Sequence, residues 1–321
     1  MKEYKLTISI VMPLYNKEAE VERAVRSVLK QTISDFELII VNDGSVDGGP
    51  ERVRAFSDPR IRIIDQTNAG VSAARNRGIG EARADLIAFL DADDEWEKDY
   101  LETIVRLRDK FPSCEVFASS YFVSTADGKK RRAIIRGLPE KLSESILNNY
   151  FFVAAQSDPP LWTSAVAVAK HAIKSVGGFP VGITAGEDLL TWARLAVRFD
   201  IAYSLEPKAI FREPATVSSR PGRVPQTPDI VGQELRKLLA GVARQKKQGL
   251  NRYIGLWHRM RANIFLRLGR RWEVLREVAR SLRHAPLDIR LPLYAMLAVL
   301  PLSPSIMMAI RELVRKRNEM V

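Results

Sequence analysis

The sequence predicts an α/β protein built on a doubly wound, mostly parallel sheet flanked by helices, with a basic helical appendage at its C-terminal end. Three observations predict this architecture. Strand-like and helix-like segments alternate from the N-terminus, two of the predicted strands end in acidic turns, and the whole formal net charge of +12 arises from residues 229–321. That last region holds 19 Lys and Arg against 7 Asp and Glu.

The first part of the chain repeats a strand-then-helix pattern. Leu6–Met12 is a nearly continuous apolar run rich in β-branched residues, which is typical of a strand buried on both faces. Apolar positions from Glu18 to Leu29 then recur at helical spacing. The same criteria predict strands at 6–12, 36–41, 61–64 and 86–90, separated by helices at 18–29, 51–56 and 71–84.

Beyond this repeat the pattern becomes less regular. A helix is expected at 98–110, a strand at 116–124 and a helix at 191–198. Residues 213–229 contain four prolines and no periodicity, which indicates a linker or mobile loop. Amphipathic patterns then predict helices at 230–247, 253–268 and 272–282. We therefore expect an α/β domain at 1–213, a linker at 214–229 and a basic amphipathic helical region at 230–321.

The composition is that of an ordinary globular protein. The chain has 321 residues, of which 46% are hydrophobic and 27% charged, so a sizeable core is available. The single cysteine, Cys114, cannot form an internal disulfide, which fits a reducing compartment. The apolar run near the N-terminus is too short, and too soon followed by charged residues, for a secretory signal.

The acidic run Asp91-Ala92-Asp93-Asp94 follows the fourth predicted strand directly. Carboxylates this close repel one another unless a cation or hydrogen bonds compensate them, and their hard oxygens suit Mg²⁺ or Mn²⁺. Asp43 follows the second strand in a similar turn. Ligands of doubly wound sheets bind at the carboxyl ends of the strands, where both turns are expected. The alternatives are an acidic cap for the helix at 98–110 and ordinary turn chemistry at Asp43.

Several motifs resemble family 2 glycosyltransferases, which have the GT-A fold. The order, spacing and strand context agree over roughly the first two-thirds of the chain. The motifs are Pro13-Leu14-Tyr15-Asn16-Lys17-Glu18, Ile39-Ile40-Val41-Asn42-Asp43-Gly44-Ser45 with Asp47, Asn68-Ala69-Gly70 through Ala74-Arg75-Asn76-Gly78, Phe89-Leu90-Asp91-Ala92-Asp93-Asp94, Gly177-Gly178-Phe179, and Glu187-Asp188 with Trp192 and Arg194.

The resemblance implies a donor site for a nucleoside-diphosphate sugar, typically linked to UDP. Asp43 would hydrogen-bond the base, and Arg75 would lie near the donor. Asp91 would address the ribose or nucleotide, and Asp93, together with Asp91, would hold Mn²⁺ or Mg²⁺ on the diphosphate. The remaining nucleotide-pocket residues implied by the resemblance are Pro13, Tyr15 and Glu18.

The resemblance also implies an acceptor side. Asp188, in the pair Glu187-Asp188, would be the general base that deprotonates the acceptor hydroxyl as it attacks the sugar from the opposite face. Such a reaction inverts the anomeric centre. The pair could equally cap the helix that follows it, and the two roles are compatible. A nucleotidyltransferase and a non-catalytic nucleotide-sugar-binding protein remain the alternative functions.

The basic C-terminal region interleaves cations with apolar stripes, which suits contact with an anionic membrane surface. A helical subdomain with a solvated basic face is the alternative, and nucleic-acid binding is disfavoured because no recognised motif is present. Leu291–Ile310 lacks charge but contains three prolines, so we expect two short interfacial helices rather than one spanning helix. We therefore expect a cytoplasmic protein, peripheral at the inner face of the membrane, that acts on a glycan or lipid-linked acceptor in cell-surface polysaccharide or glycolipid assembly.

Overall fold

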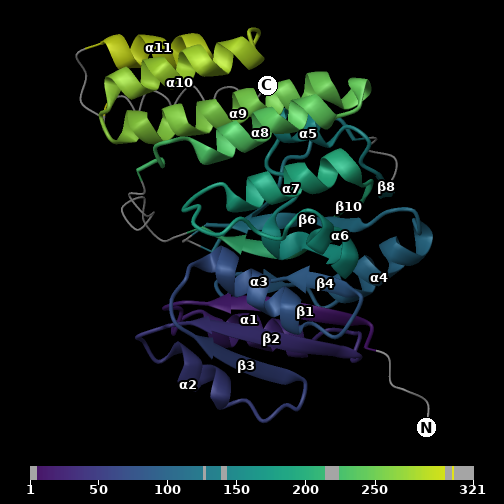
Figure 1. The fold of residues 1–321 in the computed structure, drawn as a ribbon. Coiled ribbons are helices and arrows are strands. Elements are labelled where there is room, and N and C mark those ends of the chain that lie inside the picture. The colour runs from purple at the N-terminus through teal and green to yellow at the C-terminus, as the bar shows by residue number, and fades with distance from the viewer. Residues whose placement is uncertain (1–5, 126–127, 139–142, 214–223, 301–305, 307–321) are drawn as a thin grey trace. The chain divides into compact units, whose positions relative to one another are not determined.

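The computed structural model describes residues 6–125, 128–138, 143–213, 224–300 and 306 (Figure 1). The chain divides into two compact units, Met1–Arg220 and Pro221–Val321. Each unit has a hydrophobic cluster of its own. The first unit contains the sheet, and the second unit consists of helices.

The N-terminal half of the sheet is parallel, as the alternating pattern predicts. Its order is β3-β2-β1-β4, and every neighbouring pair in it is parallel. All residues of β2 and β4 are buried, which explains why β2 is largely apolar and β4 entirely so. The strands are β1 (Ile8–Leu14), β2 (Phe36–Asp43), β3 (Ile61–Gln66) and β4 (Leu86–Phe89), and the helices between them are α1 (Val21–Leu29), α2 (Gly49–Arg54) and α3 (Val71–Glu81).

Helix α3 packs unusually close to the sheet. A Cβ atom added at Gly78 of α3 would lie 2.4 Å from Cγ1 of Val11 in β1, so a side chain at this position would push the helix off the sheet. The small residue therefore fixes the distance between α3 and the carboxyl ends of the strands, where the predicted site residues lie.

The second half of the sheet is mixed, with the order β4-β9-β6-β10-β5. Strand β9 (Val166–Ala169) is antiparallel to both of its neighbours, β4 and β6 (Val116–Ser124). Strand β10 (Ile201–Arg212) runs parallel to β6, with register shifts around Pro207. The short strands β5 (Glu95–Trp96), β7 (Lys130–Arg132) and β8 (Glu144–Ile146) add antiparallel pairs. The remaining helices are α4 (Tyr100–Lys110), α5 (Tyr150–Gln156), a 3-10 turn at Thr163–Ala165, α6 (Lys170–Ser175) and α7 (Glu187–Arg198).

The predicted α/β class is confirmed, and so is the C-terminal helical region. The second unit contains α8 (Ile230–Gly241), α9 (Arg244–Arg267), α10 (Arg271–His284) and α11 (Leu291–Val299). The expected single helix at 230–247 is wrong, because Val242 and Ala243 have extended backbone and separate α8 from α9. Asp229 caps α8 by accepting a hydrogen bond of 3.0 Å from the N–H of Gly232.

Two predicted segments lie partly outside the described residues. Of the expected linker, residues 214–223 are not described, and 224–229 belong to the second unit. The second apolar helix expected beyond Pro301 also lies outside them, whereas α11 is described. Within the described residues, no helix has both the length and the apolar character needed to cross a bilayer.

Candidate active site

Arg75 joins the two groups of predicted site residues. This side chain comes from α3 and is only 4% exposed. Its Nη2 donates a hydrogen bond of 2.7 Å to Oδ1 of Asp91, directly after β4, and its Nη1 lies 3.4 Å from Oε1 of Glu187 at the start of α7. A buried guanidinium thus holds a predicted donor-side carboxylate and a predicted acceptor-side carboxylate together.

A clamp around Phe179 positions the segment that leads into α7. Nδ2 of Asn76 donates to the carbonyl of Phe179 at 2.7 Å, and the N–H of Phe179 donates back to Oδ1 of Asn76 at 2.8 Å. Gly178 has φ +67°, and a Cβ there would lie 2.5 Å from Oδ1 of Asn76. The Phe179 ring packs edge-on against Trp192 and lies 5.0 Å from the Arg75 guanidinium. Asn76 and Phe179, which belong to two different motifs of the sequence, are therefore positioning residues whose contact the sequence does not predict.

Asp188 has a strongly perturbed acidity. Burial raises the pKa of its carboxyl from 3.8 to about 7, the negative charge of Glu187 acts in the same direction, and the positive charge of Arg75 opposes the rise. Oδ1 of Asp188 accepts a hydrogen bond of 2.7 Å from the N–H of Leu189. A carboxylate that titrates near neutral pH can accept a proton from a substrate hydroxyl, as the predicted general base must.

Asp93 lies closer to solvent than Asp91. Its Oδ2 is 2.6 Å from Nζ of Lys17, and the two side chains are 38% and 36% exposed. Partial burial alone would lower the pKa of Lys17, but the hydrogen bond to Asp93 leaves that pKa raised. Lys17 belongs to the motif Pro13–Glu18, but the sequence does not predict its ion pair with Asp93.

The remaining oxygens of Asp91 and Asp93 fit a divalent cation. Among the residues that the structure describes, Oδ2 of Asp91 and Oδ1 of Asp93 have no hydrogen-bond partner. Each carboxylate therefore keeps one hard oxygen available, the donor type that Mg²⁺ and Mn²⁺ prefer. At Asp93 a cation would compete with the Lys17 ammonium group.

Asp94, the third carboxylate of the acidic run, has a structural role instead. It is 2% exposed and accepts hydrogen bonds from Oγ of Ser164 at 2.6 Å, Nε1 of Trp162 at 3.0 Å and the N–H of Arg212 at 3.2 Å. Burial raises its pKa to about 8, and the charges of Asp93 and Asp91 add to this. Hydrogen bonds, the predicted alternative to a cation, therefore compensate this last carboxylate of the run.

Asp43 fixes the turn that precedes α3. Its Oδ1 accepts from Nε2 of Gln66 at 2.8 Å and from the N–H of Ala69 at 2.9 Å, and its Oδ2 accepts from the N–H of Gly70 at 2.9 Å. Asp43 is buried, so these bonds set where α3 begins and thereby where Arg75 lies. Its direct contact with a base stays a prediction.

The predicted pocket residues of the first motif occupy two environments. Pro13 lies in β1, and Tyr15, just beyond the strand, is 49% exposed and can stack against a ligand. Glu18 instead binds the turn after β2. Its Oε2 accepts from the N–H of Gly48 at 3.1 Å, and its own N–H donates to Oδ2 of Asp47 at 2.8 Å. Glu18 therefore ties two loops together.

The fold that carries this site is the GT-A fold of nucleotide-sugar-dependent transferases. It matches the crystal structure of S. aureus TarS 1–349 in complex with UDP-GlcNAc with a TM-score of 0.67 and 18% identity, covering 91% of this chain and 87% of that one. It also matches the mannosyltransferase PcManGT from Pyrobaculum calidifontis, solved with GDP-Man and Mn²⁺, with a TM-score of 0.54 and 18% identity, covering 97% and 81%. At these identities the likeness establishes the fold.

Sequence comparison gives the family. The model of glycosyl transferase family 2 matches residues 9–164. The glycosyltransferase GlyA of Streptococcus pneumoniae serotype 4 is 41% identical over 101 residues, which cover 31% of this chain and 14% of GlyA. Residues 9–164 of the chain thus form a family 2 glycosyltransferase region, which confirms the resemblance. Its matches span 14% to 30% of the length of the first four curated relatives.

Proposed function

We propose that this chain is an inverting glycosyltransferase that moves a sugar from a nucleoside-diphosphate sugar, linked to UDP, to an acceptor hydroxyl. The observation that carries the proposal is the buried Arg75, which contacts both Asp91 and Glu187. Asp188 follows Glu187 directly in the chain, and its pKa responds to the charges of Arg75 and Asp91. One carboxylate group then faces the leaving nucleotide, and another, with a pKa near 7, is available to the acceptor.

On the donor side, Asp91 and Asp93 would hold Mn²⁺ or Mg²⁺. When bound, the metal ion supplies positive charge that stabilises the leaving diphosphate. The free oxygen on each carboxylate supports this assignment, as does the Mn²⁺ that accompanies GDP-Man in PcManGT. The UDP-GlcNAc complex of TarS supports a uridine nucleotide. Tyr15, Pro13 and Asp43 would surround the nucleoside.

On the acceptor side, the Asp188 carboxylate would remove the proton from the acceptor hydroxyl as the oxygen forms its bond to the anomeric carbon. The bond from that carbon to the diphosphate oxygen breaks on the opposite face, so the product has inverted configuration. Glu187, bound to Arg75, keeps the start of α7 in place. Arg75 limits the rise in the pKa of Asp188, so a useful fraction of the base is ionised at neutral pH.

A donor screen tests this function. Nucleotide sugars, each with Mn²⁺, are compared by their effect on the melting temperature, because a ligand of the native state raises apparent stability. For donors that bind, the released nucleotide is then measured. Release of the nucleoside diphosphate is expected. Release of pyrophosphate would indicate nucleotidyl transfer, and donor binding without any turnover or donor hydrolysis would indicate a non-catalytic binding protein.

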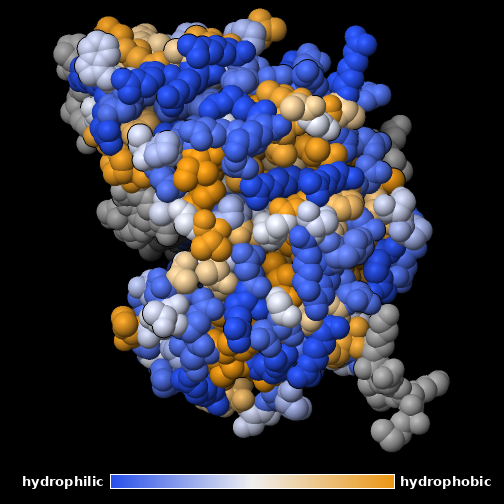
Figure 2. All heavy atoms as spheres, in the orientation of Figure 1, coloured by the Kyte–Doolittle hydropathy of each residue, from blue (hydrophilic) through white to orange (hydrophobic). Residues whose placement is uncertain are grey.

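We also propose that the second unit contacts an anionic membrane surface at the inner face of the membrane, where a lipid-linked acceptor for surface glycan assembly would lie. Leu287 and Ile289, between α10 and α11, are 85% and 84% exposed. Figure 2 shows hydrophobic side chains interspersed with hydrophilic ones over these helices. Such a mixture favours the interfacial layer of a membrane over bulk water.

Vesicle sedimentation tests the membrane contact. Leu287→Ser combined with Ile289→Ser should reduce binding to vesicles that contain phosphatidylglycerol. Val46→Ser is the matched control, since Val46 is 89% exposed on the first unit. Equal binding by the double variant and the control would remove the support for this contact.

A further inference from the structure

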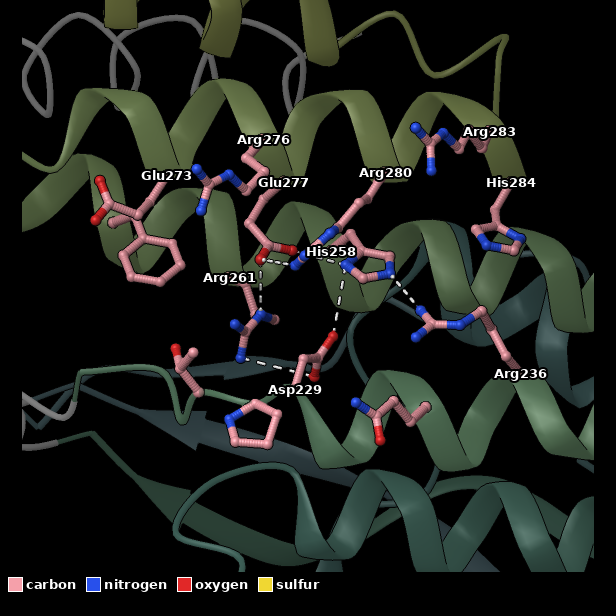
Figure 3. Close-up of a pocket in the computed structure, with 14 residues that line it drawn as sticks. Asp229, Arg236, His258, Arg261, Glu273, Arg276, Glu277, Arg280, Arg283 and His284 are labelled. Carbon is pink, nitrogen blue, oxygen red and sulfur yellow. Dashed lines mark hydrogen bonds and ion pairs between the residues drawn. The ribbon is translucent and has the colours of Figure 1, made fainter.

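The second unit contains a pocket of about 500 Å³, and none of its lining residues belongs to the proposed active site. Five arginines line it, Arg236 from α8, Arg261 from α9, and Arg276, Arg280 and Arg283 from α10. The three α10 arginines follow one another at helical spacing and point from one face of the helix (Figure 3). Three carboxylates also line the pocket, so its charge depends on which groups are already paired.

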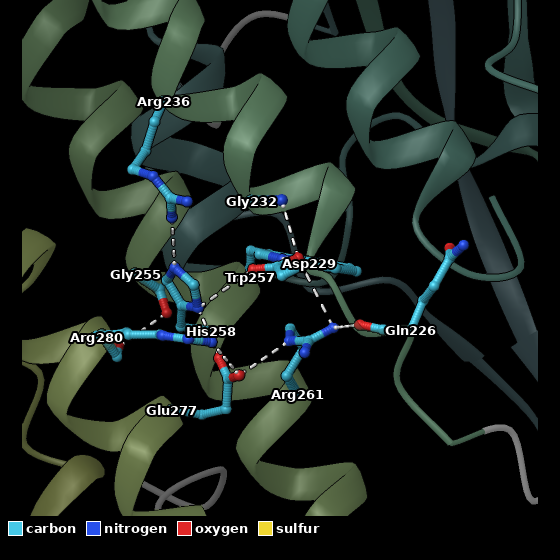
Figure 4. A network of polar contacts seen from close by, with 11 residues as sticks. Gln226, Asp229, Gly232, Arg236, Gly255, Trp257, His258, Arg261, Glu277 and Arg280 are labelled. Carbon is cyan, nitrogen blue, oxygen red and sulfur yellow. Dashed lines mark hydrogen bonds and ion pairs between the residues drawn. The ribbon is translucent and has the colours of Figure 1, made fainter. Parts of the chain in front are cut away.

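The carboxylates are engaged in a network (Figure 4). Glu277 is 2% exposed and lies 2.7 Å from Nδ1 of His258, 3.2 Å from Nε of Arg261 and 2.8 Å from Nη1 of Arg280. Asp229 accepts a hydrogen bond from Nε1 of Trp257 at 3.0 Å as well as the one that caps α8. Glu273 pairs with Arg270, which lies outside the pocket lining. Glu277 and Glu273 are thus compensated by ion pairs, and Oδ1 of Asp229 lies 3.7 Å from Nη1 of Arg261.

Three arginines of the lining, Arg236, Arg276 and Arg283, lie outside these ion pairs. In the part of the chain that the structure describes, neither Arg276 nor Arg283 has an ion-pair partner, and Arg236 contacts the imidazole Nε2 of His258 at 3.4 Å. The positive charge of Arg236 and Arg283 acts on the pKa of His284, which lines the same pocket. Burial lowers the pKa of His284, and the neighbouring His258, Arg236 and Arg283 lower it further.

A metal ion is the rival occupant. Asp229, His258 and Glu277 each offer one ligand atom, and these atoms lie within 4.8 Å of one another. However, Glu277 already contacts two guanidinium groups, and Arg236 lies against the other nitrogen of His258. A divalent cation would be repelled by these fixed positive charges and would have to displace them from their partners. The arrangement therefore favours an anion.

We propose that this pocket binds the phosphate group of a phosphorylated ligand, with Arg236, Arg276 and Arg283 as the phosphate-binding residues. Guanidinium groups match phosphate oxygens with paired N–H donors. Among the described residues none of the three arginines forms a close ion pair, although the charge of Arg276 acts on Glu273 at longer range. The volume exceeds what a single phosphate needs and suits a diphosphate or a phosphorylated sugar. The site is additional to the donor site, because it shares none of its residues.

Isothermal titration of the full chain with inorganic pyrophosphate, at constant ionic strength, tests the proposal. The double variant Arg276→Gln and Arg283→Gln removes two unpaired cations and leaves the Glu277 network intact, so its melting temperature should not change. The matched control, Arg244→Gln and Lys247→Gln, removes two exposed cations of α9 outside the pocket. We expect the parent chain to show a second binding step for pyrophosphate that depends on the pocket. The affinity of this step should be at least tenfold weaker in the pocket variant and within twofold of the parent value in the control.

Three results would overturn the proposal. Equal weakening in both variants would mean diffuse attraction, and unchanged affinity in the pocket variant would place all pyrophosphate binding elsewhere. The third result has two parts: the parent binds Zn²⁺ stoichiometrically and His258→Asn does not, and no pyrophosphate binding depends on the pocket. This result would assign the pocket to a metal.

Vesicles distinguish the two sources of such a phosphate. If the pocket variant also loses binding to phosphatidylglycerol vesicles, and pyrophosphate competes with the vesicles for the parent chain, the source is a lipid headgroup. If vesicle binding is unchanged while pyrophosphate binding is lost, the source is a soluble or substrate-borne phosphate.

Discussion

Replacing Asp188 with Asn should make the chain more stable at alkaline pH while abolishing sugar transfer. The folded-state pKa of Asp188 is raised from 3.8 to about 7, so the folded chain retains this proton longer than the unfolded chain. Between these two values the folded state binds more protons, and the free energy of unfolding falls as the pH rises. A shift of this size corresponds to at most about 4 kcal/mol. Because the Asp188 side chain is partly exposed, we expect Asp188→Asn to raise the free energy of unfolding by only about 1–2 kcal/mol at pH 8.

Urea unfolding at pH 5 and pH 8 measures this gain, and nucleotide release with Mn²⁺ and a donor identified in the screen measures activity. The gain should be small at pH 5 and larger at pH 8, and donor binding should persist. Asp109→Asn is the control, because Asp109 is 64% exposed and should change stability by less than about 0.5 kcal/mol. In the parent chain kcat/KM should rise with pH through the pKa of Asp188. A variant no more stable than the parent at pH 8, or one with normal turnover, would refute the assignment of Asp188.

Three other changes probe the parts that support the site. Arg75→Gln should cost up to about 3–5 kcal/mol of stability in urea unfolding, because it leaves the partly buried carboxylates of Asp91 and Glu187 without their counter-ion. Exposed Arg77→Gln on the same helix should cost under about 1 kcal/mol. Gly178→Ala should lower the melting temperature more than Gly182→Ala, because both glycines have positive φ but only the first would clash with a neighbouring side chain. Lys17→Gln should tighten Mn²⁺ binding, measured by calorimetry, about three- to tenfold by removing a competing cation; unchanged or weaker Mn²⁺ binding would contradict a metal at that carboxylate.

The parallel half of the sheet could be predicted because β1, β2 and β4 are buried on both faces and are therefore largely apolar in sequence, whereas β3 was recognised from its isoleucines. Strand β9 could not, since four residues of Val and Ala are too short to distinguish from the start of a helix. Strand β10 was hidden by Glu206 and Pro207, which interrupt its apolar pattern at the register shift with β6. Helix α8 was predicted too long because the break at Val242 contains no proline.

The candidate site was predictable where a motif lies on one loop. The carboxylates after β4 follow a legible strand, but their different environments depend on residues far away in sequence. Asp94 is buried because Ser164 and Trp162 reach it from another segment, whereas Asp93 stays near solvent beside Lys17. The network around Glu277 was missed for the same reason. Sequence spacing cannot reveal pairings that only the packing of helices creates.

Within the proposed mechanism, Arg75 also gives a physical reason why the donor and acceptor sides should act together. Its guanidinium is shared between Asp91 and Glu187, and the charges of Arg75, Glu187 and Asp91 all act on the pKa of Asp188. A cation bound at Asp91 would compensate that carboxylate and reduce its repulsion of Asp188. The pKa of Asp188 would then fall, and the base would be ionised more fully when the donor is in place than when the site is empty. Charge sharing through one buried side chain therefore favours proton removal from the acceptor after the donor has bound.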